Sequence, residues 1–255
     1  VHDSHKEGID AKDGSSNGKV FGNEVYNTAA VGLYVDAWEK HTYNIDVYQN
    51  IVHDAQNDGF ALASEMGGLL ENIRLYNNLS YNNRYAGIAV TRNGDSADHP
   101  MRGVAIVNNT VSGNGLSDWG GGITVDSHEA ENVTVSNNIV SGNLSFQIMV
   151  DTGVPSAQVT IDHNLIDGFR GLEDGETRGT NYVEGDPRFV NPVAADYRLQ
   201  SDSPAVDAGD NAVLPTGVTT DLDGNQRIVG GIVDMGAYEF QGKKVFLPLT
   251  LRDTP

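Results

Sequence analysis

Six asparagines recur along the first two thirds of the chain at intervals of 27, 28, 31, 29 and 26 residues, each inside a short segment of alternating apolar residues. They are Asn23, Asn50, Asn78, Asn109, Asn138 and Asn164. Alternation at period 2 is typical of strands, and no segment offers a sustained helical stripe. A repeat of about 28 residues has room for three short strands and three turns, so the pattern predicts an all-β solenoid, a parallel β-helix.

The geometry of such a stack gives the asparagines a structural role. Each strand pairs with its equivalent in the next coil, so equivalent residues lie about 4.8 Å apart. An asparagine kept at one turn position then forms a ladder of amides, a satisfied polar column beside an apolar core. We therefore expect these asparagines to hold turns and to do no chemistry.

The repeat divides the chain into three parts. Residues 1–168 carry the coils, with expansions at 92–103 and 113–121, and insertions in a solenoid often border a binding face. Residues 169–240 lose the repeat and form an acidic, glycine-rich loop followed by a small non-repeat C-terminal extension. The tail, 241–255, contains an apolar run far shorter than the ~20 residues of a membrane span.

The first residues align with the interior of a later coil. Val1-His2-Asp3 matches Val52-His53-Asp54, so the chain begins in the middle of a coil. An open first coil exposes an unpaired sheet edge, which native solenoids avoid with caps. We expect the natural protein to have upstream coils, a cap and a signal peptide.

Charge and composition limit the partners. A formal charge of −19 with only 16 Lys and Arg argues against nucleic acid, since phosphate contacts need basic side chains. It also disfavours an acidic polysaccharide unless a divalent cation bridges the two. The chain has no cysteine, and its seven histidines lack the short spacings of zinc sites. We expect a monomer that has no membrane span.

A second alignment fixes the faces of another strand in each coil. The segments begin at Gly8, Gly32, Gly59, Gly87 and Gly122, and each continues with an apolar residue at every second position. Because strand side chains alternate, the residues between them point outward. The outward columns are Asp10, Tyr34, Ala61, Ala89, Thr124 and Lys12, Asp36, Ala63, Thr91, Asp126; beyond the strand ends lie Asp13, Trp38, Glu65, Arg92 and His128.

This outer face has the composition of a polysaccharide groove. Alanines in the middle predict a shallow trough, with acidic and aromatic groups at its ends. Sugar faces stack on aromatic rings and sugar hydroxyls bond carboxylates, so polysaccharide is the expected partner. The candidate substrate-binding residues are Asp13, Tyr34, Trp38, Arg92, Asp126 and His128.

The spacing of the carboxylates suggests a catalytic group. Coil and strand spacings place Asp36 about 8 Å from Glu65, and Asp10 about 8 Å from Asp36, between backbones. Inverting glycosidases separate their two carboxylates by about 6.5–9.5 Å. Asp36 and Glu65 are therefore the candidate acid and base, with Asp10 beside them. Lys12 lies one coil from Asp36 and is an ion-pair partner unless burial lowers its pKa enough to make it a base.

The asparagine ladder and the glycine-led coils of residues 1–168 resemble the pectin-lyase-like superfamily of right-handed parallel β-helices. That resemblance implies a polysaccharide lyase, glycoside hydrolase or uronan epimerase with its site on the outer face of one sheet. Lyases of this kind use a Lys or Arg base beside a carboxylate-held Ca²⁺, a role that Lys12 with Asp10, Asp13 and Asp36 matches by motif. The hydrolases use clustered carboxylates, here Asp36 and Glu65 with Asp10 or Asp13.

The C-terminal extension carries four motifs in order over about 50 residues, among them Asp202-Ser203-Pro204-Ala205 and Met235-Gly236-Ala237-Tyr238. They resemble the choice-of-anchor modules that follow β-helices in bacterial secreted and surface proteins. This resemblance implies an extracellular or cell-envelope location in a bacterium. Within the extension, Asp221, Asp223 and Asn225 resemble part of a Ca²⁺ loop without its distal Glu; the alternative is a turn whose side chains bond their own backbone.

Two classes of function remain from the sequence. The first is an extracellular polysaccharide-active enzyme, a glycoside hydrolase in preference to a Ca²⁺-dependent lyase. The second is a non-catalytic surface β-helix that binds carbohydrate or serves as a spacer. The gathering of Asp10, Lys12, Asp36, Glu65 and Trp38 on one face favours the enzyme. No cofactor other than Ca²⁺ is suggested.

Overall fold

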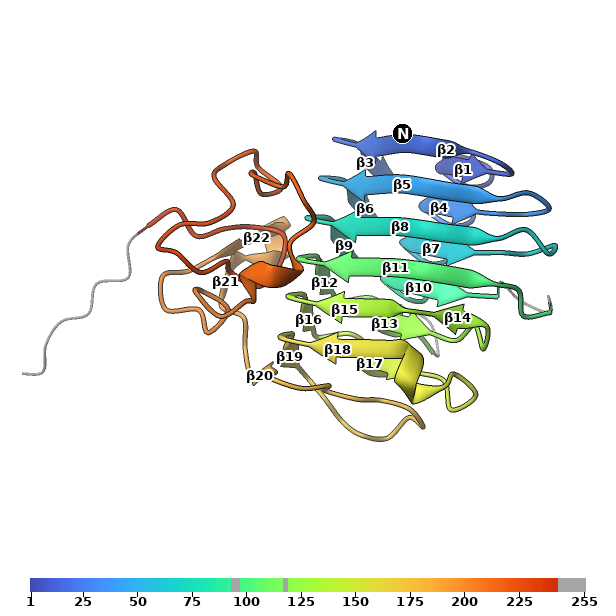
Figure 1. Cartoon of the computed structure of the whole chain (residues 1–255). Coiled ribbons are helices and arrows are strands. Elements are labelled where there is room, and N and C mark those ends of the chain that lie inside the picture. Colours follow the sequence, from blue (N-terminus) through green and yellow to red (C-terminus); the bar gives the residue numbers. More distant parts are fainter. Residues whose placement is uncertain (93–96, 117–118, 243–255) are drawn as a thin grey trace, which may run out of the picture.

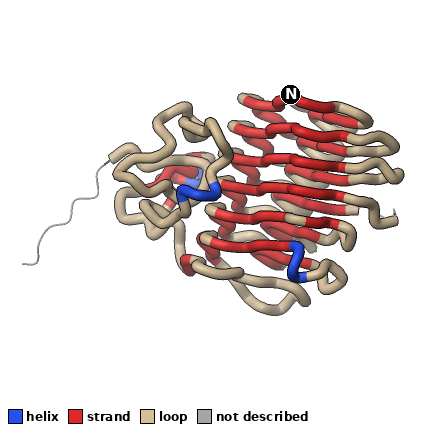
Figure 2. Tube along the Cα trace, viewed as in Figure 1, coloured by secondary structure: helices blue, strands red, loops and turns tan. Residues whose placement is uncertain are grey.

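The computed structural model describes residues 1–92, 97–116 and 119–242, and in these the chain is a stack of β coils with a C-terminal extension on one side (Figure 1). Strands dominate, and the helices of the described residues are three single 3₁₀ turns, η1 (Ser156–Gln158), η2 (Pro192–Ala194) and η3 (Asn211–Val213) (Figure 2). The predicted all-β solenoid is confirmed.

Three parallel sheets form the sides of the coils, and each strand pairs with its equivalent in the next coil. Sheet I consists of β1 (Ile9–Lys12), β4 (Leu33–Asp36), β7 (Phe60–Ala63), β10 (Ile88–Thr91), β13 (Gly121–Val125) and β17 (Phe146–Val150). Sheet II consists of β2 (Ser16–Phe21), β5 (Thr42–Tyr48), β8 (Leu70–Tyr76), β11 (Met101–Val107), β15 (Val133–Ser136) and β18 (Val159–Asp162), with β14 (Ala130–Glu131) also paired to β11. Sheet III consists of β3 (Glu24–Tyr26), β6 (Ile51–His53), β9 (Leu79–Tyr81), β12 (Thr110–Ser112), β16 (Ile139–Ser141), β19 (Leu165–Asp167) and β20 (Val183–Glu184).

The inward residues of the three sheets fill one continuous apolar core. Its members from sheet I include Leu33, Phe60, Ile88 and Ile123, each at most 1% exposed. These residues stack directly on one another from coil to coil, as their alignment predicts. Burial of such aligned aliphatic side chains is the main stabilising term of the solenoid, at about 25 cal/mol per Å² of apolar surface.

The asparagine ladder forms as predicted. Side-chain amide bonds of 2.9–3.0 Å join consecutive members of the series from Asn23 to Asn164. Asn109, for example, donates to Asn138 and to the carbonyl of Leu75, and its own oxygen accepts the backbone N–H of Asn78. The amides therefore satisfy one another and their turns, and from Asn50 onward they do so in a fully buried column.

A second ladder, which we did not predict, stabilises the turn between sheet III and sheet I. Asn83, Asn114 and Asn143 are joined by side-chain bonds of 2.9–3.0 Å, and Gln147 continues the column at 2.9 Å. Their spacings of 31 and 29 residues match those of the first ladder, so the signal is present in the sequence. Asparagine columns thus flank both ends of β9, β12 and β16.

The C-terminal extension packs on the outer face of sheet III. It contains the hairpin of β21 (Phe189–Asn191) and β22 (Asp196–Leu199). Leu79, Ile139 and Leu165 from sheet III form a second apolar cluster with Phe189, Tyr197, Leu199, Ala205, Val206, Met235, Ala237 and Tyr238 of the extension. The extension thereby covers an apolar face that the solenoid alone leaves exposed.

The domain boundaries stay predictions. The last full coil ends with β19, close to the predicted limit at residue 168, but β20 adds a further pair to sheet III at Leu165 and Ile166. Most of the predicted tail, residues 243–255, lies outside the described residues. In the described part of the chain, no helix has the length and apolar character that crossing a membrane requires.

Candidate active site

The outer face of sheet I has the register that the sequence predicts. Asp10 pairs with Tyr34 and Lys12 with Asp36, while Ala61 and Ala89 continue the first outward column. Thr124 follows Ala89 in the same column, on β13. The predicted site residues are thus distributed along one face, but the structure separates them into two groups.

The first group, which we call the lysine cluster, consists of Asp10, Lys12, Tyr34, Asp36 and Glu65. The Lys12 Nζ atom lies 2.9 Å from Asp36 Oδ2 and 3.9 Å from Glu65 Oε2. The Tyr34 hydroxyl donates a hydrogen bond of 2.5 Å to Glu65 Oε1. Three coils therefore contribute to a single hydrogen-bonded and ion-paired group.

The indole of Trp38 adds an aromatic contact to the lysine cluster. The Lys12 ammonium lies 4.1 Å from the centroid of the Trp38 ring, well within the range of a cation–π contact. Trp38 lies two residues after the end of β4 and adopts a positive φ of 46°. The sequence expectation of an aromatic ring beside the carboxylates is met, with Lys12 on one face of the ring.

Asp36 is the internal support of the lysine cluster. Its side chain has no exposed surface, and its Oδ1 atom accepts the backbone N–H of Trp38 at 2.8 Å and of Glu65 at 3.3 Å. These bonds fix the two segments that follow β4 and β7. As the structure places it, Asp36 orients Lys12, Trp38 and Glu65, and its carboxylate has no surface through which to contact a sugar.

Tyr34 has a similar position. Its ring is 1% exposed and packs with Val31, Ala61 and Ala63 in a small apolar cluster on the outer face. Because this cluster fills the middle of the predicted trough, the alanines there do not form an open groove. Tyr34 acts on Glu65 through its hydroxyl.

Two titrating groups of the lysine cluster have shifted pKa values. Loss of surrounding water raises the pKa of Asp10 to about 6, with Glu7, Asp36 and Glu65 adding to the rise and Lys12 opposing it. Desolvation lowers the pKa of Lys12, but its hydrogen bond to Asp36 and the nearby carboxylates outweigh this, so the pKa of Lys12 lies above its usual value. Lys12 is therefore an ammonium at neutral pH.

Asp13 does not join the lysine cluster. Its carboxylate pairs with Lys40 at 2.8 Å, and this hydrogen bond lowers the pKa of Asp13. The positive φ of Asp13, 50°, turns the chain away directly after β1. Its predicted contact with substrate stays a prediction.

The second group lies at the far end of sheet I and beyond its strands. His128 stands between two carboxylates, with Nε2 2.8 Å from Asp151 Oδ1 and Nδ1 3.4 Å from Asp98 Oδ2. Arg92 approaches the same Asp98 oxygen at 3.8 Å. Arg92 and His128 thus belong to one ion network, separate from the lysine cluster.

Asp126 lines a hollow of about 320 Å³ on the outer face of β10 and β13. The other lining residues are Asn57, Asp58, Tyr85, Ala86, Ala89, Thr91, Trp119 and Thr124. This hollow, which we call the β10 hollow, is the open part of the predicted trough, displaced toward later coils because Tyr34 fills the earlier part.

Sequence reasoning missed Asp58, Tyr85 and Trp119 in the β10 hollow. They come from the turns between sheet III and sheet I, so strand alternation says nothing of their direction. Desolvation raises the pKa of Asp58 to about 7, with Asp126 adding to the rise and the Ala86 N–H opposing it. Desolvation also raises the pKa of Asp126, against hydrogen bonding from Thr91 and the charge of Arg92.

The C-terminal residues considered for Ca²⁺ have other partners. Asp221 accepts backbone N–H groups from Asn225 at 2.8 Å and Glu239 at 3.0 Å, and Asp223 pairs with Arg198 at 2.6 Å. The bond from Asn225 to Asp221 is of the kind expected for the turn that we considered as the alternative, and the Ca²⁺ site stays a prediction. Throughout the described ranges, no three His, Cys, Asp or Glu side chains converge as metal ligands.

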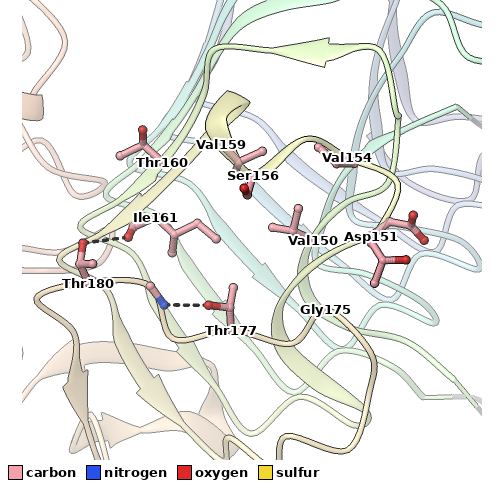
Figure 3. Close-up of a pocket in the computed structure, with 12 residues that line it drawn as sticks. Val150, Asp151, Val154, Ser156, Val159, Thr160, Ile161, Gly175, Thr177 and Thr180 are labelled. Carbon is pink, nitrogen blue, oxygen red and sulfur yellow. Dashed lines mark hydrogen bonds between the residues drawn. The ribbon is translucent and has the colours of Figure 1, made fainter.

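A cavity of about 650 Å³ lies at the last coil, away from the lysine cluster (Figure 3). Val150, Val154, Val159 and Ile161 line it, and the segment with Thr177 and Thr180 forms its other wall. These aliphatic residues border the end of the solenoid core. Asp151 is the titratable residue in its lining, so the cavity offers little catalytic chemistry.

Comparisons with known proteins agree with this fold. Residues 1–100 match the family model described as a right handed beta helix region. The crystal structure of pectate lyase Pel9A superimposes with a TM-score of 0.50 at 15% identity, covering 91% of this chain and 70% of that one. The fold is a right-handed, pectin-lyase-like parallel β-helix. At this identity the similarity concerns the fold alone.

One protein is similar in sequence, and a further solved structure resembles part of the fold. The Bacillus subtilis (strain 168) protein YwoF is 26% identical over 201 residues, which are 69% of this chain and 40% of YwoF, so the match spans well under half of that protein. The A-module of the mannuronan C-5 epimerase AlgE4 from Azotobacter vinelandii is 14% identical with a TM-score of 0.45, over 73% of this chain and 55% of that one.

Proposed function

We propose that the protein is a polysaccharide-active enzyme, a glycoside hydrolase whose substrate lies on the outer face of sheet I. The observation that carries this proposal is the lysine cluster, in which Glu65 is held by Tyr34 and Lys12 close to an acid, Asp10, that is still partly protonated near neutral pH. On an ordinary solvated sheet face, charged side chains are scattered and do not gather into one hydrogen-bonded and ion-paired group.

Hydrolysis of a glycosidic bond requires one protonated acid and one carboxylate. Asp10, with a pKa of about 6, supplies the proton to the leaving oxygen. Glu65, whose side chain keeps 15% of its surface exposed, supplies the carboxylate. Asp36 is a positioning residue in this proposal because it is buried and bonded to the backbone of Glu65.

Elimination by a lysine base is the second candidate, and the lysine cluster disfavours it. A base must be neutral, whereas Asp36 and Glu65 hold Lys12 as an ammonium. The carboxylates considered for Ca²⁺ are also taken, Asp13 by Lys40 and Asp36 by Lys12 and two N–H groups. The residues present do not fit a Ca²⁺ site at this position.

A polysaccharide panel tests the proposal. The chain is incubated with neutral, amino and uronic polysaccharides, with and without chelator, and the products are assayed for reducing ends and for ultraviolet absorbance of unsaturated ends. We expect new reducing ends, no unsaturated ends and no effect of chelator. Unsaturated ends that vanish with chelator would select the lyase, and binding without cleavage would select the non-catalytic module.

We further infer that the protein acts in the extracellular space or at the cell envelope of a bacterium. The C-terminal extension, with its resemblance to anchor modules, supports this location, and the relative YwoF is bacterial. Fractionation of cells that express the full-length gene tests it, with the protein expected in the medium or the envelope fraction.

A further inference from the structure

The β10 hollow is a built site beyond the lysine cluster. Ala89 and Thr124 form its floor on sheet I, and Asp58, Tyr85 and Trp119 rise from the turns beside it. Its volume of about 320 Å³ lies at the lower end of ligand pockets, about 300–1,000 Å³, and suits one small cyclic unit.

An unpartnered hydroxyl faces this hollow. Thr124 is 3% exposed, and its Oγ1 atom has no hydrogen-bond partner among the described residues. The Asp126 Oδ1 atom is likewise buried without a partner there. Buried polar atoms in proteins are nearly always hydrogen-bonded, because leaving one unsatisfied is unfavourable. Both atoms therefore indicate a ligand that brings hydrogen-bond donors.

The charge of the hollow defines the ligand further. Asp58 and Asp126 line the same hollow, and Asp126 is close enough to disfavour ionisation of the Asp58 carboxyl. The charged groups facing Asp126 from neighbouring elements are Arg92 and Asp151, which oppose each other. The site consequently favours a cationic group and repels an anionic one.

The aromatic residues complete the description. Trp119 is 42% exposed and is held by Phe146 at a ring distance of 5.4 Å, so its indole is fixed while part of it remains accessible. Tyr85 also lines the hollow, and the Arg84 guanidinium lies 5.5 Å from the centroid of its ring. Aromatic faces bind both the apolar face of a sugar and an ammonium group.

We propose that the β10 hollow is a subsite for an amino sugar with a free ammonium group. The ammonium donates to Asp58 and Asp126, a sugar hydroxyl donates to Thr124, and the sugar ring lies against Trp119. A uronic acid in the same place brings a third carboxylate to Asp58 and Asp126 and is rejected. This inference rests on the proposed function, because it assumes that sheet I binds a polysaccharide.

Calorimetric titration of the full chain with three tetrasaccharides at pH 7 tests the subsite. The probes are tetramers of glucosamine, of N-acetylglucosamine and of galacturonic acid, the first two differing in the ammonium group that acetylation removes. We expect the glucosamine tetramer to bind at least about tenfold more tightly than either other probe. Equal or tighter binding of the acetylated tetramer or of the galacturonate overturns the assignment.

Variants localise the binding. Asp58→Asn/Asp126→Asn keeps the shape and one acceptor oxygen of each side chain but removes the carboxylate charge, so the glucosamine tetramer should bind at least about tenfold more weakly. Glu71→Gln/Glu131→Gln removes the same charge from sheet II and should change the affinity less than about twofold. An equal loss in both double variants means that the net charge of the protein, and not the hollow, attracts the probe.

The outcome is separable from that of the proposed function. If the panel shows cleavage of another glycan while glucosamine tetramer does not bind, the amino-sugar subsite is wrong and the hydrolase proposal stands. If glucosamine tetramer binds at the hollow but no glycan in the panel is cleaved, the subsite stands and the hydrolase proposal falls.

Discussion

At the scale of single residues, the candidate site depends on where each carboxylate is buried. Asp36 is closed off from solvent and ion-paired, whereas Asp10 and Glu65 retain exposed surface. The sequence alone placed Asp36 on the outer face and could not show that Trp38 and Glu65 would fold over it. Burial depends on the path of the chain after each strand, which strand periodicity does not determine.

The role of Asp36 can be measured by stability. Asp36→Asn removes the charge that pairs with Lys12, and breaking a buried ion pair is strongly destabilising, so we expect a loss of about 2–3 kcal/mol in the free energy of unfolding. Urea denaturation measures this loss. The control is Asp13→Asn, which breaks an exposed pair with Lys40 and should leave the midpoint nearly unchanged. An equal loss in the free energy of unfolding in Asp36→Asn and Asp13→Asn would show that Asp36 does not support the lysine cluster from a buried position.

Asp58 gives the stability a defined pH dependence. Its pKa is about 7 in the folded chain and near 3.8 in the unfolded chain, so the folded state binds more protons between these values. Stability therefore falls as pH rises from about 4 to 7 and levels off above. Asp58→Asn lacks this contribution. Its free energy of unfolding should therefore fall less between pH 4 and pH 7 than that of the wild type, by roughly 1–3 kcal/mol.

Urea denaturation at pH 4.5 and at pH 8 measures the free energy of unfolding of the wild type and of Asp58→Asn. Glu131→Gln, an exposed change on sheet II, is the control and should keep the wild-type drop. Asp10, Asp234 and Glu239 also have raised pKa values and contribute to the loss of stability between pH 4.5 and pH 8. Asp58→Asn should therefore reduce this loss and not abolish it. A drop of unchanged size in Asp58→Asn would mean that Asp58 is not desolvated.

At the scale of elements, amide columns and aligned strands determine the solenoid. The sequence predicted the first column and the register of sheet I because both repeat with the coil. The second column, from Asn83 to Gln147, repeats equally well but ends in a glutamine, which breaks the asparagine pattern. The extension on sheet III was not predictable in detail because it has no repeat, and its contacts join residues far apart in sequence, such as Asn77 and Thr220.

The ladder predicts a position-dependent cost of losing one amide. Asn109→Ala removes the acceptor of the Asn78 backbone N–H and the side-chain donor to the Leu75 carbonyl and to Asn138 in a buried site, so we expect a loss of about 3 kcal/mol in the free energy of unfolding. Asn23 lies at the less buried end of the column, so Asn23→Ala should lower the free energy of unfolding by about 1 kcal/mol or less. Thermal and urea unfolding measure both variants. Equal losses would argue against a cooperative buried column.

At the scale of the whole molecule, the extension and the solenoid share a polar core contact. Arg227 is 1% exposed and donates to the carbonyl of Asp234 at 2.7 Å, with Glu239 at 3.5 Å and Asn77 of the solenoid at 3.4 Å. Desolvation lowers the pKa of Arg227, and the acidic neighbours oppose this. The extension is therefore attached by apolar packing and by the hydrogen bond of Arg227 to Asn77, and Glu239 of the extension pairs the buried charge of Arg227.

Removing one member of this pair should weaken the attachment. Arg227→Met leaves Glu239 buried without its cation, so we expect a loss of about 3–5 kcal/mol, and Arg227→Met/Glu239→Gln should recover part of it. Urea unfolding of Arg227→Met, of Glu239→Gln and of the double variant gives the coupling free energy between the two side chains. Strict additivity would contradict a direct interaction between the two side chains.

The central claim, that the lysine cluster on sheet I cleaves a polysaccharide, is tested most directly by kcat/KM on the glycan that the panel selects. Glu65→Gln keeps the shape of the side chain but removes the carboxylate, and kcat/KM should fall by about 10²-fold or more. Glu71→Gln makes the same change on sheet II and should stay within about twofold of the wild type. Full turnover in Glu65→Gln, or an equal fall in Glu71→Gln, would contradict the account.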